Sequence, residues 1–409
     1  MRIAPLFILL AACGNDTALD PPGPGAEPVY YGQVERILTD NCVECHSDNP
    51  DRLAPFSLEG LENARSAAED TPLAFSVMNR VMPPYYAKND GSCQTFHGTK
   101  WLTDEQIDTL VTWTNGARLE GEPVAPPTPP TPAKLPAIDK TLDIGTSYMP
   151  KGSADDYRCF VIDAVATTDQ YLTGVHVRPG NATVVHHVIV NTLTSDAAQQ
   201  AILDRDALDA APGYECTNGA GEGTNFLTGW APGAGVTIFP ADTGLLVPAN
   251  RKLVIQIHYN SSNTNGQPDR TLVDFDLAAN VSKRATILAV RGDVNLPPRQ
   301  VDATAVGTQL LQLGNLASAR VWGGAIHMHT RGTGAQVHVQ RGGDQCLLDL
   351  DGWSFHWQHF YWYEQPYTVN KGETLRVTCH YDTTGDTQNV TWGEGTGDEM
   401  CLAYLYVSL

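Results

Sequence analysis

The run Pro126-Pro127-Thr128-Pro129-Pro130-Thr131-Pro132 divides the sequence into two parts with different residue patterns. Proline fixes φ and lacks a backbone N–H, so such a run favours an extended connector. A second run of this kind, Asp-Pro-Pro-Gly-Pro-Gly, covers residues 20–25. We therefore expect a flexible tether over residues 14–27 and a Pro-rich linker over residues 122–137.

Between these two runs the sequence is typical of helices. Apolar residues recur at helical spacing, and Asp104 and Glu105 fall where a first helical turn favours acidic side chains. The expected helices cover residues 29–39, 60–69, 72–81 and 103–117. The pattern predicts a small all-α domain over residues 28–121.

From residue 141 onward, short β-rich runs are separated by Gly, Asn, Asp and Pro. The expected strands include residues 170–177, 184–192, 252–259, 335–340 and 375–380. Many short strands over this length predict two antiparallel β-sandwiches, one over residues 138–272 and one over residues 273–409. The fold class is therefore multidomain, with a helical domain followed by two β-sandwich domains.

The composition is that of a folded chain with an acidic balance. The 409 residues are 42% hydrophobic and 18% charged, and 26 basic against 46 acidic side chains give a formal net charge of -20. This charge disfavours phosphate backbones and anionic lipid surfaces as partners. We therefore expect no nucleic-acid binding.

The N-terminal residues 1–13 have the pattern of a secretory signal. Arg2 precedes a short apolar run, and Leu-Ala-Ala-Cys at residues 10–13 resembles the bacterial lipobox, in which Cys13 would be acylated. The alternative is an ordinary signal peptide with an incidental cysteine. The lipoprotein interpretation predicts a bacterial cell-envelope protein, periplasmic or associated with the outer membrane, that meets the membrane through its lipid anchor only.

The motif Cys42-Val43-Glu44-Cys45-His46 predicts one covalently attached c-type haem. Cys42 and Cys45 would form the thioether bonds, and His46 would bind the iron axially. A zinc site or a disulfide Cys-X-X-Cys with a chance histidine is the alternative. For the sixth iron ligand we favour Met82, on a loop stiffened by two prolines, over Met78 and His97, although either methionine would also serve as core packing.

Five histidines downstream form an ordered set. His186 and His187 are adjacent in a strand-like run, so both can bind one metal only if the strand bulges or ends there. His258 could complete their site from a neighbouring strand. His327 and His329 have the i, i+2 spacing that places both rings on one face of a strand.

Met400 adds a soft thioether ligand, and imidazoles with a thioether favour copper. Taken singly, each of these histidines would more often be a hydrogen-bonded core residue, and Met400 would more often be packing.

The ordered set His-His, Gln-X-His-Tyr, His-X-His and Asp-Glu-Met-Cys resembles the copper type II ascorbate-dependent monooxygenases. This is the family of peptidylglycine alpha-hydroxylating monooxygenase and dopamine beta-monooxygenase. Residues 148–150 and 156–159 resemble the family's opening segment, and the resemblance covers residues 141–409. The front end, with residues 54–58 and 82–84, resembles the cytochrome c domain fused to bacterial members.

The resemblance implies two jelly-roll-like copper domains with two copper ions. His186, His187 and His258 would hold an electron-transfer copper. The oxygen-binding copper would be held by His327, His329 and Met400, which with Tyr404 would form the catalytic site. The resemblance also implies a disulfide between Cys379 and Cys401.

After one cysteine for lipid and two for haem, six of the nine cysteines remain, an even number that suits disulfides in an oxidising compartment. The pairing of the other four stays open: Cys93, Cys159, Cys216 and Cys346.

Two departures from the family bear on the substrate. Ala325 and Leu402 stand where peptide-hydroxylating relatives carry an Arg and an Asn, whereas Tyr404 keeps the family's phenol. We infer a small non-peptide substrate and a more apolar pocket. The aromatic run over residues 353–363 would either wall this pocket or belong to the sandwich core.

The resulting hypothesis is an enzyme that hydroxylates a C–H bond with O2. Its electrons would enter through the haem, from a redox protein or an ascorbate-like reductant in the periplasm or outside the cell. The rival hypothesis is a non-catalytic haem and copper electron carrier or a copper-binding surface lipoprotein.

Overall fold

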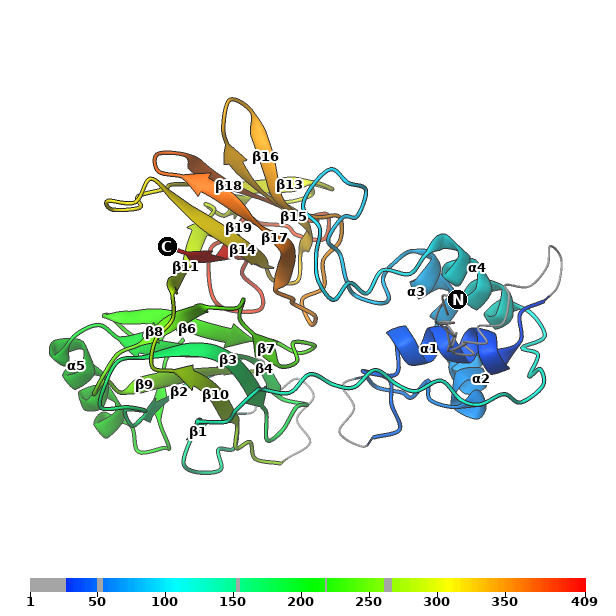
Figure 1. Cartoon of the computed structure of the whole chain (residues 1–409), viewed down its shortest axis with the longest axis horizontal. Coiled ribbons are helices and arrows are strands. Elements are labelled where there is room, and N and C mark those ends of the chain that lie inside the picture. Colours follow the sequence, from blue (N-terminus) through cyan, green and yellow to red (C-terminus); the bar gives the residue numbers. More distant parts are fainter. Residues whose placement is uncertain (1–26, 50–53, 152–154, 218, 261–266) are drawn as a thin grey trace, which may run out of the picture. The chain divides into compact units, whose positions relative to one another are not determined.

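The computed structural model describes residues 27–49, 54–151, 155–217, 219–260 and 267–409 (Figure 1). The expected signal segment 1–13, with Cys13, lies outside the described residues. The chain forms two units, which we call the helical unit (Met1–Arg80 and Leu102–Pro130) and the β unit (Val81–Trp101 and Thr131–Leu409). No helix among the described residues is long and apolar enough to cross a membrane.

The described residues of the helical unit form an irregular helical turn, η1, and four α-helices. Their bounds are η1 Tyr30–Val34, α1 Glu35–Asn41, α2 Leu61–Asp70, α3 Leu73–Met78 and α4 Asp104–Asn115. The helix α4 begins with a capping box, in which Thr103 and Gln106 each accept a backbone N–H of the other. The core of the helical unit contains the buried side chains of Tyr30, Leu38, Leu110 and Trp113, so one face of the helices packs inward.

In the part of the β unit that the structure describes, one helix accompanies the strands of two sandwiches. Their bounds are β1 Lys140–Asp143, β2 Asp156–Ile162, β3 Gln170–Arg178, β4 Val185–Leu193, α5 Asp196–Leu208, β5 Tyr214–Glu215, β6 Thr224–Trp230, β7 Thr237–Ile238, β8 Thr243–Val247, β9 Leu253–Tyr259, β10 Leu272–Ala278, β11 Lys283–Arg291, β12 Asn295–Leu296, β13 Ala303–Leu310, β14 Ser318–His327, β15 Gly332–Gln340, β16 Asp344–Leu350, β17 Tyr361–Asn370, β18 Thr374–Tyr381, β19 Val390–Thr391 and β20 Leu402–Ser408.

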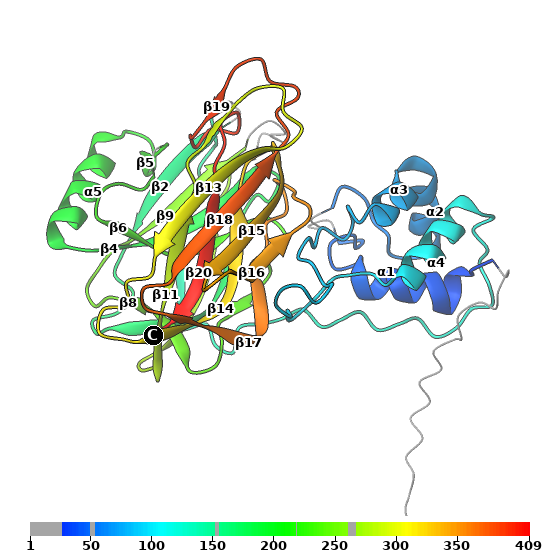
Figure 2. The same cartoon turned by 90° about the horizontal axis from the view of Figure 1, so that it is seen from above.

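One sheet runs through both sandwiches, in the order β1-β10-β3-β8-β11-β20-β14-β17, with β7 paired to β3. The halves join where β8 pairs with β11 in parallel, Gly244 opposite Arg284. A five-stranded sheet, β5-β2-β9-β4-β6, covers the first half, and a four-stranded sheet, β13-β18-β15-β16, covers the second (Figure 2). Two separate apolar cores fill the spaces between these layers.

Successive side chains of β9 point to opposite faces of the sheet, so this strand contributes to two cores. Leu253, Ile255 and Ile257 face the core between the sheets, whereas Val254 faces the opposite side. There it packs in a small cluster with Ile202 of α5, so this helix covers the outer face of the five-stranded sheet. The sequence pattern did not predict α5, although Ser195 caps its N-terminus by accepting a hydrogen bond from the Ala198 N–H.

Residues 81–101, which we call the strap, belong to the β unit. The disulfide Cys93–Cys346 ties the strap to β16. Isolated bridges pair Ala87 with Leu350 and Phe96 with Tyr363. The structure thus differs from the expected continuous helical domain over 28–121, because these contacts remove the strap from the helical unit.

The boundary between the sandwiches also lies later than the expected 272/273. The strand β10 pairs with β1 and β3 of the first sandwich, and β11 is the first strand of the second. The crossing therefore falls between Ala278 and Lys283.

Candidate metal centre

A bulge in β4 brings the adjacent residues His186 and His187 together. The register between β4 and β9 shifts between Val185 and His187, and His187 then lies opposite His258. On a regular strand the two neighbouring rings would face opposite sides of the sheet. Instead, the ring centroids of the three histidines lie 4.8 to 5.6 Å apart.

The three rings can present nitrogen atoms to one ion. One ligand atom from each histidine lies within 4.8 Å of the others. His258 donates Nε2–H to Asp155 Oδ1 at 2.8 Å, which leaves the lone pair on Nδ1, a buried atom with no partner among the described residues. The Nδ1 atoms of His186 and His187 lie 3.4 Å apart. We name these three histidines the first cluster.

Two members of the first cluster, His186 and His187, are held in the neutral form that metal ions bind. Burial, followed by the nearby imidazoles, lowers the pKa of His186 to about 2 and that of His187 well below its ordinary value. Burial would raise the pKa of Asp155, but hydrogen bonds from His258 and Thr396 outweigh it and hold this pKa below its usual range. Asp155 is therefore an anionic partner for the His258 ring.

His327 and His329 lie together where β14 ends, with ring centroids 5.2 Å apart. His327 donates Nδ1–H to Gln358 Oε1 at 2.7 Å, and Gln358 is itself oriented because its Nε2 donates to the Phe355 carbonyl. His329 donates Nδ1–H to the Asp398 carbonyl at 3.1 Å. Both rings therefore keep the lone pair on Nε2, and burial lowers the pKa of both, that of His327 to about 3.

Glu399 ties Met400 to this pair. Its carboxyl group accepts the His329 backbone N–H at 2.8 Å and the Met400 N–H at 3.3 Å. Tyr381 donates its hydroxyl to the Met400 carbonyl at 2.8 Å. Burial raises the pKa of Glu399 to about 7. We name His327, His329 and Met400 the second cluster.

The disulfide implied by the resemblance is present. Cys379 and Cys401 are bonded, and they join β18 to the residue that follows Met400. The four cysteines whose pairing stayed open form Cys93–Cys346 and Cys159–Cys216.

One cavity of about 310 Å³ is lined by His187 of the first cluster and by the whole second cluster. His187, His327, His329, Met400 and Tyr404 all line it, and the His187 and His327 ring centroids are 5.9 Å apart. Its wall is mainly apolar, with Ile189, Phe226, Trp230, Phe239, Trp362 and Trp392 among the lining residues. Ala325 and Leu402 also line it, and of the described residues no lysine or arginine does.

The aromatic run over residues 353–363 serves both of the roles considered from the sequence. Phe360 and Trp362 line the cavity, whereas Tyr361 and Tyr363 are buried in the second core. Phe355 stacks on His186 of the first sandwich with ring centroids 4.2 Å apart. One segment of the second sandwich therefore contacts both clusters.

The motif Cys42–His46 lies at the C-terminal end of α1 in the helical unit. Backbone N–H groups of Cys45 and His46 both donate to the Cys42 carbonyl, at 3.1 and 2.9 Å. His46 donates Nδ1–H to the Phe56 carbonyl at 3.0 Å, which fixes the lone pair on Nε2, as an axial haem ligand requires. These residues therefore fit a c-type haem.

The candidate sixth ligands fall in different units. Met78 ends α3 of the helical unit and is exposed, whereas Met82 and His97 lie in the strap.

Comparison with known proteins bears on the second sandwich directly. Residues 285–407 match the C-terminal domain of copper type II ascorbate-dependent monooxygenases. This match runs from β11 to β20 and includes His327, His329, Met400 and Tyr404. It supports the family that the sequence resembles.

Curated relatives extend the similarity to copper monooxygenases beyond this domain. Tyramine beta-hydroxylase of Caenorhabditis briggsae is 25% identical over 249 residues, which cover 56% of this chain and 41% of that protein. DBH-like monooxygenase protein 1 of Gallus gallus is 27% identical over 246 residues, which cover 54% of this chain and 39% of that protein. Dopamine beta-hydroxylase of Rattus norvegicus is 22% identical over 343 residues, covering 79% and 54%. The chain thus spans about half the length of these relatives or less.

Several residues that shape the site were not singled out from the sequence. Asp155, Gln358 and Glu399 each orient a member of a cluster. Glu399 lies within the Asp-Glu-Met-Cys motif, and Gln358 lies within the aromatic run, so proximity to a motif was their only signal. Nothing adjacent in sequence connects Asp155 with His258.

Proposed function

We propose that this chain is a copper-dependent monooxygenase that hydroxylates a C–H bond of a small, non-peptide substrate with O2. The observation that carries the proposal is that two clusters of histidines, one of which includes Met400, both contribute to the lining of a single, mainly apolar cavity. Similarity to tyramine and dopamine beta-hydroxylases supports it.

The two clusters would divide the work between two copper ions. His186, His187 and His258 would hold one ion through Nδ1 atoms, and His327, His329 and Met400 would hold the other through Nε2 atoms and the thioether. Bound copper would supply one-electron transfer at the first cluster and oxygen activation at the second. Asp155, Gln358 and the Asp398 carbonyl would fix the ring tautomers that this ligation requires.

The cavity favours an apolar substrate over a peptide. A peptide C-terminus brings a carboxylate, which would need a cationic or donor-rich partner in a buried site. Ala325 and Leu402 offer neither, and no lysine or arginine of the described residues lines the cavity. Aromatic and aliphatic walls would instead exclude water from the reacting C–H bond.

We further propose that electrons enter through a haem c in the helical unit, as in a bacterial form of this family. Cys42 and Cys45 would hold the haem covalently, with His46 as an axial ligand. A lipid on Cys13 would keep the protein at the cell envelope, near a periplasmic or extracellular electron donor or an ascorbate-like reductant.

Isotope labelling tests the hydroxylation. Copper-loaded protein, supplied with reductant, ¹⁸O2 and a panel of alkylbenzenes and arylalkylamines, should form product that contains one ¹⁸O atom. Met400→Ala should abolish product while the first cluster still binds copper. If the coppers bind and undergo reduction but no probe gains ¹⁸O, the electron-carrier alternative replaces the monooxygenase.

A separate variant tests the haem. Cys42→Ala/Cys45→Ala should lose the covalent haem absorption on a denaturing gel yet keep both copper ions. Unchanged haem staining in this variant would contradict the assignment.

A further inference from the structure

The cavity contains an acidic side chain to which the proposed reaction assigns no role. Glu394 lies in the segment between β19 and β20 and lines the cavity together with both clusters. The Gly219 backbone lies near Oε1 of its carboxyl group. Its other oxygen, Oε2, is buried and has no hydrogen-bond partner among the described residues. A buried acceptor left in this state costs about 1–3 kcal/mol unless a ligand or water satisfies it.

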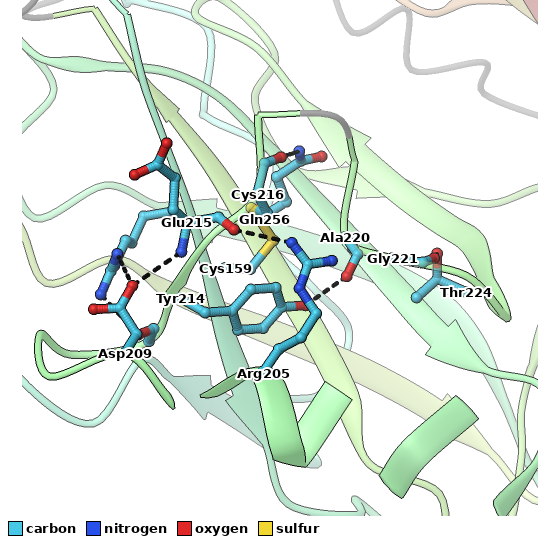
Figure 3. Close-up of a disulfide and its surroundings, with 12 residues drawn as sticks. Cys159, Arg205, Asp209, Tyr214, Glu215, Cys216, Ala220, Gly221, Thr224 and Gln256 are labelled. Carbon is cyan, nitrogen blue, oxygen red and sulfur yellow. Dashed lines mark hydrogen bonds and ion pairs between the residues drawn. A yellow bond between two sulfur atoms is a disulfide. The ribbon is translucent and has the colours of Figure 1, made fainter. Parts of the chain in front are cut away.

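The described residues of the loop after β5 are anchored at several points (Figure 3). The disulfide Cys159–Cys216 joins β2 to the start of this loop, and Gln256 of β9 donates to the Cys216 carbonyl at 3.1 Å. Tyr214 donates its hydroxyl to the Ala220 carbonyl at 2.6 Å. Gly219 lies between these anchors, and its N–H donates to the Cys216 carbonyl at 3.1 Å.

A backbone contact fixes the position of Glu394 from the other side. Tyr157 donates its hydroxyl to the Glu394 carbonyl, and the Tyr157 ring stacks on His258 of the first cluster with centroids 4.1 Å apart. The carboxyl group thus belongs to a segment that is anchored next to the metal centre.

Aromatic side chains line the cavity around the carboxyl group, and no lysine or arginine of the described residues does. Burial raises the pKa of Glu394 to about 7. Its charge in turn contributes to the raised pKa of Tyr404 and of Tyr157, which places it near both phenols. Phe226 stacks on Tyr404 at 5.1 Å and, with Trp392, supplies aromatic wall. The cavity therefore offers a carboxyl acceptor in a mainly apolar space, which Gln256 and Gln358 also line.

We propose that Glu394 is a specificity-determining residue that receives the hydrogen-bond donor of the substrate, a hydroxyl group or a protonated amine at one end of an otherwise apolar molecule. This inference rests on the proposed function and adds the polar contact that orients the substrate. A substrate with no donor would leave Oε2 unsatisfied, whereas one with a carboxylate would meet a like charge. The cavity would then discriminate among substrates by their hydrogen-bond donors as well as by their size.

Binding without turnover tests the proposal. Propylbenzene, 2-phenylethanol and 2-phenylethylammonium have the same number of non-hydrogen atoms and differ at one end. Their affinities for the full-length, copper-loaded protein are measured by calorimetry without oxygen. The wild type should bind at least one donor-bearing probe about 10-fold more tightly than propylbenzene.

Two substitutions separate the kinds of donor. Glu394→Leu should abolish the preference for either donor. Glu394→Gln keeps an acceptor oxygen without the charge, so it should retain a preference for the alcohol and lose one for the ammonium ion. Glu222→Leu, an exposed glutamate outside the cavity, is the matched control and should behave as the wild type. Thermal unfolding and copper content verify that each variant folds.

The absence of a donor preference in the wild type, including the absence of binding by all three probes, would overturn the proposal. So would a preference that survives in Glu394→Leu. Because no oxygen is present, these results are independent of catalysis. A protein with the donor preference but no ¹⁸O incorporation would refute the monooxygenase function while leaving the recognition role of Glu394 intact.

Discussion

Gln358 Oε1 accepts a hydrogen bond from His327 Nδ1 at 2.7 Å, and this bond links the aromatic segment of the second sandwich to the second cluster. The same segment places Phe355 on the His186 ring of the first cluster. A change in this segment therefore reaches both clusters, through a hydrogen bond on one side and a ring contact on the other.

The substitution Gln358→Leu should weaken copper binding at the second cluster. His327 would lose the acceptor that fixes its tautomer, and loss of such a partner lowers metal affinity by roughly 10–100-fold. Copper titration followed by X-ray absorption checks this, with Gln345→Leu, an exposed site on β16, as the control. Wild-type affinity in Gln358→Leu would show that packing alone orients His327.

The substitution Asp155→Ala should act at the first cluster. Asp155 accepts His258 Nε2–H at 2.8 Å, so its removal should lower copper affinity there by about 10–100-fold. The exposed helical site Asp204→Ala is the control. Asp155 also accepts the Thr396 N–H at 3.0 Å, so an equal loss at both clusters would mean that its main role is to hold the segment before Met400.

Removal of the Cys379–Cys401 disulfide should affect both stability and the second cluster. The bond spans 22 positions, for which chain entropy gives a loss of about 3 kcal/mol in the free energy of unfolding. Cys379→Ala/Cys401→Ala should also lower copper occupancy next to Met400, measured on folded protein. Cys159→Ala/Cys216→Ala removes a bond that spans 57 positions. It should destabilise to a similar extent while leaving the second cluster occupied.

Asp209 should give a pH-dependent contribution to stability. Its carboxylate pairs at 2.8 Å with Arg158, whose side chain is 1% exposed, and the hydrogen bond from Arg158 lowers the pKa of Asp209 to about 2. A lowered carboxyl pKa stabilises the fold above the unfolded value, and the contribution is lost as pH falls through the folded value.

Asp209→Asn leaves a buried arginine unpaired and should cost about 3 kcal/mol at pH 7. The free energies of unfolding in urea should show the full difference between wild type and variant above about pH 4. This difference should shrink as the pH falls toward 2. A difference that is independent of pH would contradict the assignment to this ion pair.

Local patterns predicted the secondary structure well. Expected helices such as 60–69 and strands such as 184–192 agree with α2 and β4 within three residues at each end. These segments obey a clear period, which the backbone geometry imposes on any amphipathic element. The helix α5 lacked a strong apolar stripe, so only its cap residue Ser195 could have signalled it.

The parts of the site that could be predicted are the ligand residues that lie within short sequence motifs. The adjacent pair His186 and His187 required a bulge, and the structure has one. Partners from distant segments left no local trace: Gln358 is 31 positions from His327, and Asp155 is 103 from His258. The strap escaped prediction for the same reason, because Cys93 and Cys346 are 253 positions apart.

The parallel pairing of β8 with β11 has a practical consequence for dissection of the protein. A recombinant fragment that stops at Ala278 would expose the backbone N–H and C=O groups of β8, and the complementary fragment would expose those of β11. Each fragment would have an unpaired edge strand, to which a strand of another molecule could pair. We expect either half, when expressed alone, to aggregate, whereas co-expression of both halves should restore a soluble pair.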